Sequence, residues 1–271
     1  MFGDSTLNTH PSLVSDFLSF DTAFPLFVAD CVPTNINLSN TASLMQKRAQ
    51  ALKLFPRGTP KDKATANANS VPTTFWTIYH LLKNPDAFKA VKQEINQHLK
   101  FQSLKKANDA SWTSEMLQKC VLLDSVVDES LRLSASSMLL RIAIEPTVLV
   151  MDDTTYHFEK GYRVAIFPSL GHFDPVLFPE PNKFPYDRFV NATQEQLDAF
   201  KPFGMGISMC PGRYFAKNQL KMFVALVLQH LSTIKLAPGS KEPTLDSSRL
   251  GLGVIPPADH SIKIELTIHK E

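Results

Sequence analysis

The spacing of apolar residues predicts two amphipathic helices and one almost wholly apolar helix. In the first, the apolar positions are Phe88, Val91, Ile95 and Leu99. They follow Asn84-Pro85, which suits a helix start, and Lys89, Lys92 and Glu94 are expected to face solvent. In the second, the apolar positions are Leu123, Val126, Val127 and Leu131. The third helix, residues 211–230, has little polar face and is therefore expected in the core.

Alternation of apolar and polar residues predicts strands after the second helix. The segments are 148–150, 156–158 and 162–167, with a turn at Asp152-Asp153. Prolines between residues 175 and 202 exclude regular strand ladders there and predict an irregular, aromatic-rich meander. Residues 55–70 read as an irregular linker, followed by helical composition from Thr73 to Leu82. The fold class predicted is mainly α with a small β-sheet (α+β).

Composition and charge exclude several classes of protein. The chain has 271 residues, 44% of them apolar, which is enough to bury a sizeable core. A net charge of +2, without a dense basic run, argues against nucleic acid as a partner. Cys31, Cys120 and Cys210 are too few and too widely spaced for a disulfide framework or a zinc site. No segment has the length and hydropathy of a membrane span, so membrane association is expected to be peripheral at most.

The segment 203–212 carries the clearest chemical signal, because it places one cysteine between glycines just before the apolar helix. Pro211, directly after Cys210, suits a first helical position. A sulfur at a helix N-terminus lies near unpaired N–H groups and the positive end of the helix dipole, which favour a negative charge. Such a loop can present a thiolate to a metal. The alternative is that Cys210 is a small apolar residue in an ordinary turn.

The spacing of Phe203, Gly204, Gly206, Cys210 and Gly212 resembles the haem-binding loop of the cytochrome P450 family. Three further features occur in the order seen in that family. They are 129–132 (Glu-Ser-Leu-Arg), 172–175 (His-Phe-Asp-Pro) and 186–189 (Tyr-Asp-Arg-Phe). A hydrolase using His172 and Asp174 is the competing interpretation, but no nucleophile elbow accompanies these residues.

The resemblance implies the C-terminal portion of the cytochrome P450 fold, without its N-terminal half, as one partial domain over residues 1–271. Residues 1–70 would supply substrate-side helices and the irregular linker, and 71–271 the haem-binding core. Glu129, Arg132 and Arg188 would form a buried ionic triad. The cofactor implied is haem b, with the Cys210 thiolate on its iron and Phe203, Gly204 and Gly212 shaping the loop. Arg141 would pair with a haem propionate, or is an ordinary cation at a strand edge.

The chain departs from the family pattern at two places. Ser208 stands where most members have a basic residue. On the oxygen-facing helix, Val71 and Pro72 replace the usual acid and threonine, so Asn69, Thr73 or an ordered water are the candidates for proton delivery. The run from Asn69 to Trp76 resembles the branch of sterol 7-alpha and 12-alpha hydroxylases and prostacyclin synthase.

The function implied by the resemblance is insertion of one oxygen atom from O2 into an apolar substrate of the sterol or oxysterol class. The alternatives are a truncated, non-catalytic fragment and a haem-thiolate isomerase acting on a lipid peroxide. Apolar side chains that would line a pocket are Phe75, Met138, Leu139, Leu140 and Leu252. NADPH-cytochrome P450 reductase is the partner expected for a hydroxylase, with Arg213, Lys217 and Lys221 as its docking charges or as a solvated helix face. The location implied is the cytoplasmic face of the endoplasmic reticulum membrane.

Overall fold

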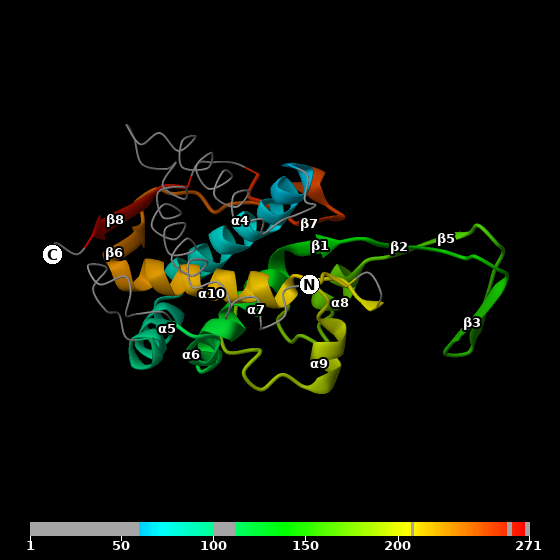
Figure 1. Ribbon diagram of the computed structural model, residues 1–271, viewed down its shortest axis with the longest axis horizontal. Coiled ribbons are helices and arrows are strands. Elements are labelled where there is room, and N and C mark those ends of the chain that lie inside the picture. Colours follow the sequence, from blue (N-terminus) through cyan, green and yellow to red (C-terminus); the bar gives the residue numbers. More distant parts are fainter. Residues whose placement is uncertain (1–59, 100–111, 207–208, 259–261, 269–271) are drawn as a thin grey trace, which may run out of the picture.

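The computed structural model describes residues 60–99, 112–206, 209–258 and 262–268 (Figure 1). Its α-helices are α4 (Pro60–Lys83), α5 (Pro85–His98), α6 (Ser114–Gln118), α7 (Val121–Ser134), α8 (Pro168–His172), α9 (Gln194–Ala199) and α10 (Arg213–His230). Its strands are β1 (Ala135–Ser137), β2 (Leu139–Ile142), β3 (Thr147–Met151), β4 (Thr154–Phe158), β5 (Arg163–Ile166), β6 (Leu231–Leu236), β7 (Leu252–Val254) and β8 (Ile264–Ile268). A 3-10 turn, η4, covers Ser247–Arg249.

Four helices, α4, α5, α7 and α10, form the core of the molecule (Figure 1). The predicted apolar stripes meet there: Val91 and Ile95 of α5, Leu123 and Val126 of α7, and Leu228 of α10 are all buried. Cys120 is buried in the same cluster. The sequence therefore predicted the inward faces of α5 and α7 correctly. The prediction for α10 holds only for its C-terminal half, because Phe215 near its start is exposed. None of the helices in the described residues is long and apolar enough to cross a membrane.

Helix α5 begins as predicted, whereas Glu94 is only partly exposed and its carboxylate is hydrogen-bonded to α7. The Ala87 amide donates to Asn84 Oδ1 at 3.1 Å, which confirms the predicted cap. Glu94 accepts hydrogen bonds from the amides of Leu122 and Leu123 at 2.8 and 2.9 Å. It thereby caps α7, whose own N-terminal flanking residue makes no side-chain cap. The prediction for Glu94 was wrong because the groups it caps lie 28 and 29 positions away in the sequence.

Helix α4 begins at Pro60, so the predicted irregular linker over 55–70 is wrong from residue 60 onward. The boundary drawn between residues 70 and 71 falls inside this helix, and residues 55–59 lie outside the described residues. Pro72 lies within α4 and cannot donate to the carbonyl four residues before it. The helix continues because its C-terminal half is anchored by packing: Trp76 is buried and its Nε1 donates to the Ile255 carbonyl at 2.7 Å.

The three predicted strands are present as β3, β4 and β5. In the described residues eight strands pair as four two-stranded antiparallel sheets, and β1, β2, β6, β7 and β8 were not predicted. Strands β3 and β4 form a hairpin whose turn contains Asp152 at φ 50°, as the sequence predicted. β2 pairs with β5, and the four strands together form an arm that extends away from the helices (Figure 1). Residues 173–202 contain no strand, as the prolines predicted, but the irregular meander ends at residue 193 because Gln194–Ala199 form helix α9.

Candidate functional site

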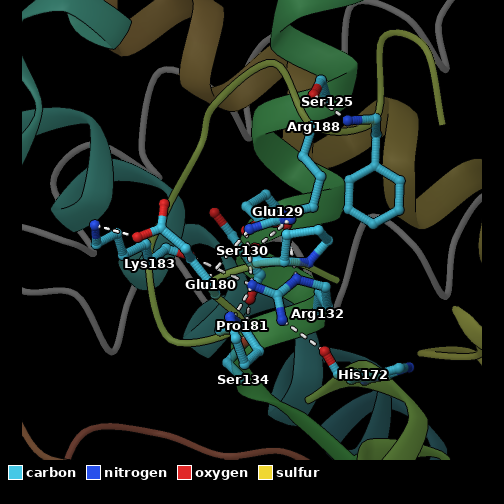
Figure 2. A network of polar contacts seen from close by, with 12 residues as sticks. Ser125, Glu129, Ser130, Arg132, Ser134, His172, Glu180, Pro181, Lys183 and Arg188 are labelled. Carbon is cyan, nitrogen blue, oxygen red and sulfur yellow. Dashed lines mark hydrogen bonds and ion pairs between the residues drawn. The ribbon is translucent and has the colours of Figure 1, made fainter. Parts of the chain in front are cut away.

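Three charged side chains form a buried ion-pair network where α7 meets the meander (Figure 2). Arg132 Nε donates to Glu129 Oε2 at 2.8 Å, and Arg132 Nη2 donates to Glu129 Oε1 at 2.8 Å. Arg188 Nε donates to the same Oε1 at 3.1 Å. Glu129 and Arg132 are fully buried. The structure thus confirms the predicted triad, because residues three positions apart on α7 share one face and Arg188 reaches that face from the meander.

Backbone carbonyls of the meander complete the coordination of the two arginines. Arg132 Nη1 donates to the carbonyl of His172 at 2.6 Å, and Arg132 Nη2 donates to that of Pro181 at 2.8 Å. Arg188 Nη1 donates to the carbonyl of Pro179 at 2.9 Å. The triad carries two positive charges and one negative charge, so these carbonyl dipoles help to offset the excess charge in a buried place. The network therefore fixes the path of the meander relative to α7.

The Cys210 loop lies directly before α10 and is closed by backbone hydrogen bonds. The Cys210 amide donates to the carbonyl of Phe203 at 3.0 Å, and the Met209 amide donates to that of Gly206 at 3.0 Å. The Gly204 amide donates to the carbonyl of Lys201 at 3.1 Å. Cys210 is exposed and forms no disulfide. Its thiol is therefore presented at the surface of a defined loop, whereas Cys120, the other described cysteine, is buried.

Gly206 and Gly212 differ in what their positions in the loop require. Gly206 has φ +63°, a left-handed conformation that L residues with a Cβ rarely adopt. A Cβ on Gly212 would lie 3.9 Å from Cys210 Sγ, in van der Waals contact with it. The first helical residue of α10 is Arg213, so the prediction that Pro211 occupies this position was wrong. The Gly212 carbonyl instead accepts the first helical hydrogen bond, from the Ala216 amide at 2.9 Å.

Arg141 of β2 reaches the same loop. Its Nη2 donates to the carbonyl of Met205 at 3.1 Å and would lie 3.8 Å from a Cβ on Gly206. Its Nη1 donates to the carbonyl of Leu140 at 2.9 Å. The structure therefore brings a cation to the loop that carries Cys210, although the two residues are far apart in the sequence. Ser208 lies outside the described residues.

Comparison with known proteins assigns this arrangement to a family. The sequence profile of the cytochrome P450 family matches residues 66–264, which include the triad, Arg141 and the Cys210 loop. The chain belongs to the cytochrome P450 family. It is 34% identical over 206 residues to cholesterol 7-alpha-monooxygenase of Cricetulus griseus, a match covering 71% of this chain and 41% of that protein.

A second curated relative is also a sterol hydroxylase, and a solved structure shares the fold. The chain is 36% identical over 217 residues to 7-alpha-hydroxycholest-4-en-3-one 12-alpha-hydroxylase of Homo sapiens, covering 75% of this chain and 43% of the relative. The crystal structure of the cytochrome P450DA heme domain matches with a TM-score of 0.58 at 24% identity, over 74% of this chain and 42% of that one. The chain therefore spans about two fifths of the length of these relatives.

The cofactor of the cytochrome P450 family is haem, held by a cysteine thiolate. The residues of this chain fit that group. The exposed Cys210 would supply the soft ligand, and the guanidinium of Arg141 would supply a cation near the loop. Phe203 and Gly204 contribute to the loop through their backbone hydrogen bonds.

Asn69 and Thr73 both belong to α4, and both are already hydrogen-bonded. Asn69 Oδ1 accepts from the amide of Val254 in β7 at 2.9 Å. Thr73 is buried, and its hydroxyl donates to the Asn69 carbonyl at 2.7 Å. The first contact, which joins α4 to β7 across 185 positions, was not visible in the sequence.

The lysines of α10 fit neither of the two expectations from the sequence, which were docking charges for a reductase and a solvated helix face. Lys217 Nζ donates to Asp128 and Asp124 of α7 at 2.9 and 3.2 Å, and buried Lys221 contacts Asp124 at 3.0 Å. Both lysines therefore hold α7 against α10, and neither is a free docking charge or a fully solvated face. The sequence did not reveal the partners of these lysines, because Asp124 and Asp128 belong to a different helix. Arg213 is nearer the surface, where its guanidinium lies 4.3 Å from the ring centroid of Tyr214.

The predicted pocket residues are divided between the core and the surface. Leu139 is buried, whereas Met138, Leu140 and Leu252 are exposed. β1 and β7 bring Met138 and Leu252 into the same region, since Leu252 pairs with Ser137 and the Met138 amide donates to the Gly251 carbonyl at 3.1 Å. Of these exposed residues, Leu252 belongs to β7, which packs against α4.

Proposed function

We propose that this chain is a haem-thiolate monooxygenase whose metal ligand is Cys210. The observation that carries the proposal is the exposed Cys210 thiol, held by the Phe203 hydrogen bond in a glycine-containing loop at the start of α10. A haem with a thiolate ligand supplies the activation of O2 when it is bound. The triad of Glu129, Arg132 and Arg188 supports the site indirectly by fixing the meander that leads into the loop.

Arg141 and the loop residues have separate roles in this proposal. Arg141 pairs with a propionate, because its guanidinium already lies beside the loop and a carboxylate is a stronger acceptor than the Met205 carbonyl that it now contacts. Phe203 holds the Cys210 amide through its carbonyl, and Gly212 lies beside the sulfur, where a Cβ would be 3.9 Å from Sγ. These residues bind and orient the cofactor and carry out no proton transfer.

Proton delivery is assigned to Asn69 and Thr73. Thr73 Oγ1 donates its own proton to the Asn69 carbonyl, so its oxygen can only accept from a water or a substrate hydroxyl. Asn69 uses its Oδ1 on Val254, which leaves the Nδ2 hydrogens to orient such a water. The pair would thus position the water rather than act as an acid, because neither side chain ionises near neutral pH.

The substrate class proposed is a sterol or oxysterol. Support comes from the relatives, which include a cholesterol 7-alpha-monooxygenase and a 12-alpha-hydroxylase of a hydroxycholestenone. The exposed apolar side chains of Met138 and Leu252 suit a rigid apolar ligand. NADPH-cytochrome P450 reductase is the proposed electron donor, and the cytoplasmic face of the endoplasmic reticulum membrane is the proposed location.

A carbon monoxide difference spectrum tests the ligand assignment. The chain is expressed with haem supplied, reduced and exposed to carbon monoxide. The wild type and Cys31→Ala should show the Soret band of a thiolate-ligated complex, and Cys210→Ala should lack it. No band in the wild type would support the non-catalytic fragment instead, and an unchanged band in Cys210→Ala would contradict the assignment.

A product assay tests the reaction. Hydroxylation consumes one C–H bond, O2, NADPH and a proton, and yields C–OH, water and NADP+. Sterols, 25-hydroxylated sterols and a fatty-acid endoperoxide are therefore incubated with the haem-loaded chain and reductase, and products are identified by mass spectrometry. NADPH-dependent gain of one oxygen by a sterol supports the proposal. Rearrangement of the peroxide without NADPH would favour the isomerase.

A further inference from the structure

His172 is hydrogen-bonded at both its backbone and its ring, and the two bonds lead to different parts of the site. Its carbonyl accepts from Arg132 Nη1 at 2.6 Å, as Figure 2 shows. Its ring Nε2 accepts from the amide of Lys201 at 3.0 Å. Lys201 follows α9 and lies two residues before Phe203. One residue therefore joins the ionic triad to the segment that enters the Cys210 loop.

The bond to Lys201 determines the protonation of the His172 ring. A backbone amide can only donate, so Nε2 must be unprotonated. The ring is buried, and this burial, together with the positive charge of Arg132, lowers the pKa of His172 to about 4. At neutral pH the ring is therefore neutral and its single proton is on Nδ1, which has no hydrogen-bond partner among the described residues.

The Lys201 segment is fixed from several directions. The Lys201 carbonyl accepts from Gly204, and the Phe203 carbonyl accepts from Cys210, at 3.1 and 3.0 Å. Helix α8, which carries His172, packs closely on the end of α9: a Cβ on Gly171 would lie 3.7 Å from Ala199. The Lys201 amide links this segment to His172, and the His172 carbonyl in turn contacts the buried Arg132 of α7.

We propose that His172 is a positioning residue: its ring nitrogen holds the Lys201 amide and thereby places the Cys210 loop relative to the ionic triad. The part of the proposal that concerns the sulfur rests on the proposed role of Cys210 as haem ligand. The link between His172 and Lys201 stands independently, because it is made entirely by residues of the chain.

Two variants distinguish the role of the His172 side chain as a hydrogen-bond acceptor from its role in filling space. In His172→Gln, the amide oxygen lies at about the distance of the ring Nε2 from the backbone and can accept from Lys201. In His172→Leu, an apolar side chain fills the space but accepts nothing. A residue needed only for packing would tolerate leucine at least as well as glutamine, since the site is buried.

Two measurements without haem test the link. Nitrogen NMR of the labelled wild type should show a neutral His172 ring protonated at Nδ1. Hydrogen exchange at the Lys201 amide should be about five-fold or more faster in His172→Leu than in the wild type, and His172→Gln should restore most of the protection. An Nε2-protonated ring, or equal exchange in all three proteins, would overturn the link.

A third measurement tests the consequence for the sulfur. The fraction of thiolate-ligated carbon monoxide complex should fall in His172→Leu and be retained in His172→Gln, at matched haem content. If the Lys201 amide exchanged faster in His172→Leu but the fraction of thiolate-ligated complex were unchanged, the positioning role would be overturned. A wild type without any haem band would count against the proposed function, and the exchange and tautomer results would still decide the link.

Discussion

The buried charges of Glu129, Arg132 and Arg188 make single residues unusually important in this chain. Buried ion pairs often contribute little net stability, because desolvation offsets their attraction. Removing one partner is a different matter, since it leaves the remaining charges unpaired in a place that water does not reach. Glu129 is the only carboxylate of the triad, so both arginines depend on it.

Glu129→Gln should lower the free energy of unfolding by about 3–5 kcal/mol, because it leaves two buried guanidinium groups without a counter-charge. Denaturant unfolding followed by circular dichroism measures this change. Glu265→Gln is the matched control, because Glu265 pairs with Lys235 at the surface and its loss should cost at most about 1 kcal/mol. Equal losses in the two variants would contradict the importance given to the triad.

Gly253→Ala should lower the free energy of unfolding by about 2–4 kcal/mol. Gly253 has φ +120°, and a Cβ there would lie only 2.2 Å from Asn69 Oδ1, so the bond from Asn69 to Val254 would have to break. Gly161→Ala is the control for backbone strain alone, because nothing lies within 4 Å of its Cβ position.

A double-mutant cycle identifies the contact responsible. Asn69→Ala removes the clashing oxygen, so the cost of Gly253→Ala should be smaller in that background than in the wild type. Thermal or denaturant unfolding of the wild type, the two single variants and the double variant gives the coupling free energy between the two positions. Strict additivity would mean that Asn69 does not contact this strand as the structure shows.

At the residue scale, the sequence revealed what belongs to a recognisable motif. Cys210 and the triad were predicted because each lies in a segment of fixed spacing. The capping of α7 by Glu94 and the bond from His172 to Lys201 were not predicted, because each joins a side chain to a backbone amide in a distant segment. No local pattern specifies which amide a buried side chain will meet.

At the scale of elements, the interface between α7 and α10 combines apolar packing with a cluster of charges. Lys217 lies between two aspartates of α7, at 2.9 and 3.2 Å. Burial raises the pKa of Asp128 to about 6, against the opposing effect of Lys217, and Asp128 Oδ1 has no hydrogen-bond partner among the described residues. The interface therefore contains one carboxylate that takes up a proton at a higher pH than an ordinary aspartate does.

Asp128 should make the chain more stable relative to Asp128→Asn as the pH falls from about 6 to about 4. In this window the folded chain retains a proton on Asp128 that the unfolded chain has released, so folding takes up a proton. The effect is at most about 1.4 kcal/mol per pH unit. Denaturant unfolding of both proteins at each pH measures it, and a difference that is constant or of opposite sign would refute it.

The elements themselves were predictable to different degrees. Helices α5, α7 and α10 were predictable from the spacing of their apolar residues, because a helix with such spacing can bury one face in any fold. The first half of α4 was not, because one proline, two lysines and two asparagines over residues 60–70 give the segment the composition of a loop. Further along α4, Asn69 accepts a hydrogen bond from the Val254 amide and Trp76 donates one to the Ile255 carbonyl. Local helix propensity cannot anticipate these tertiary contacts.

At the scale of the whole molecule, the helical core and the arm differ in how they are stabilised. The core is built from four helices with buried apolar faces. In the arm, every residue of β3 is exposed, and β4 is exposed except at Phe158. The hairpin at the tip of the arm therefore contributes little to the stability of the core.

Replacing residues 144–161 by Asn-Gly should change the free energy of unfolding by less than about 1 kcal/mol. The new turn would directly join Ala143 and Tyr162, which are already hydrogen-bonded at 2.9 Å. Denaturant unfolding and helix content by circular dichroism measure the result. A loss of several kcal/mol would show that the hairpin packs on the core.

Arg132 uses every nitrogen of its guanidinium group, with Nε and Nη2 on Glu129 and Nη1 on the carbonyl of His172. A missense change to lysine would conserve the charge and still abolish the forked geometry, since an ammonium group cannot bind both oxygens of a carboxylate side by side. Substitution scores that treat the two basic residues as interchangeable would therefore misclassify such an allele as benign.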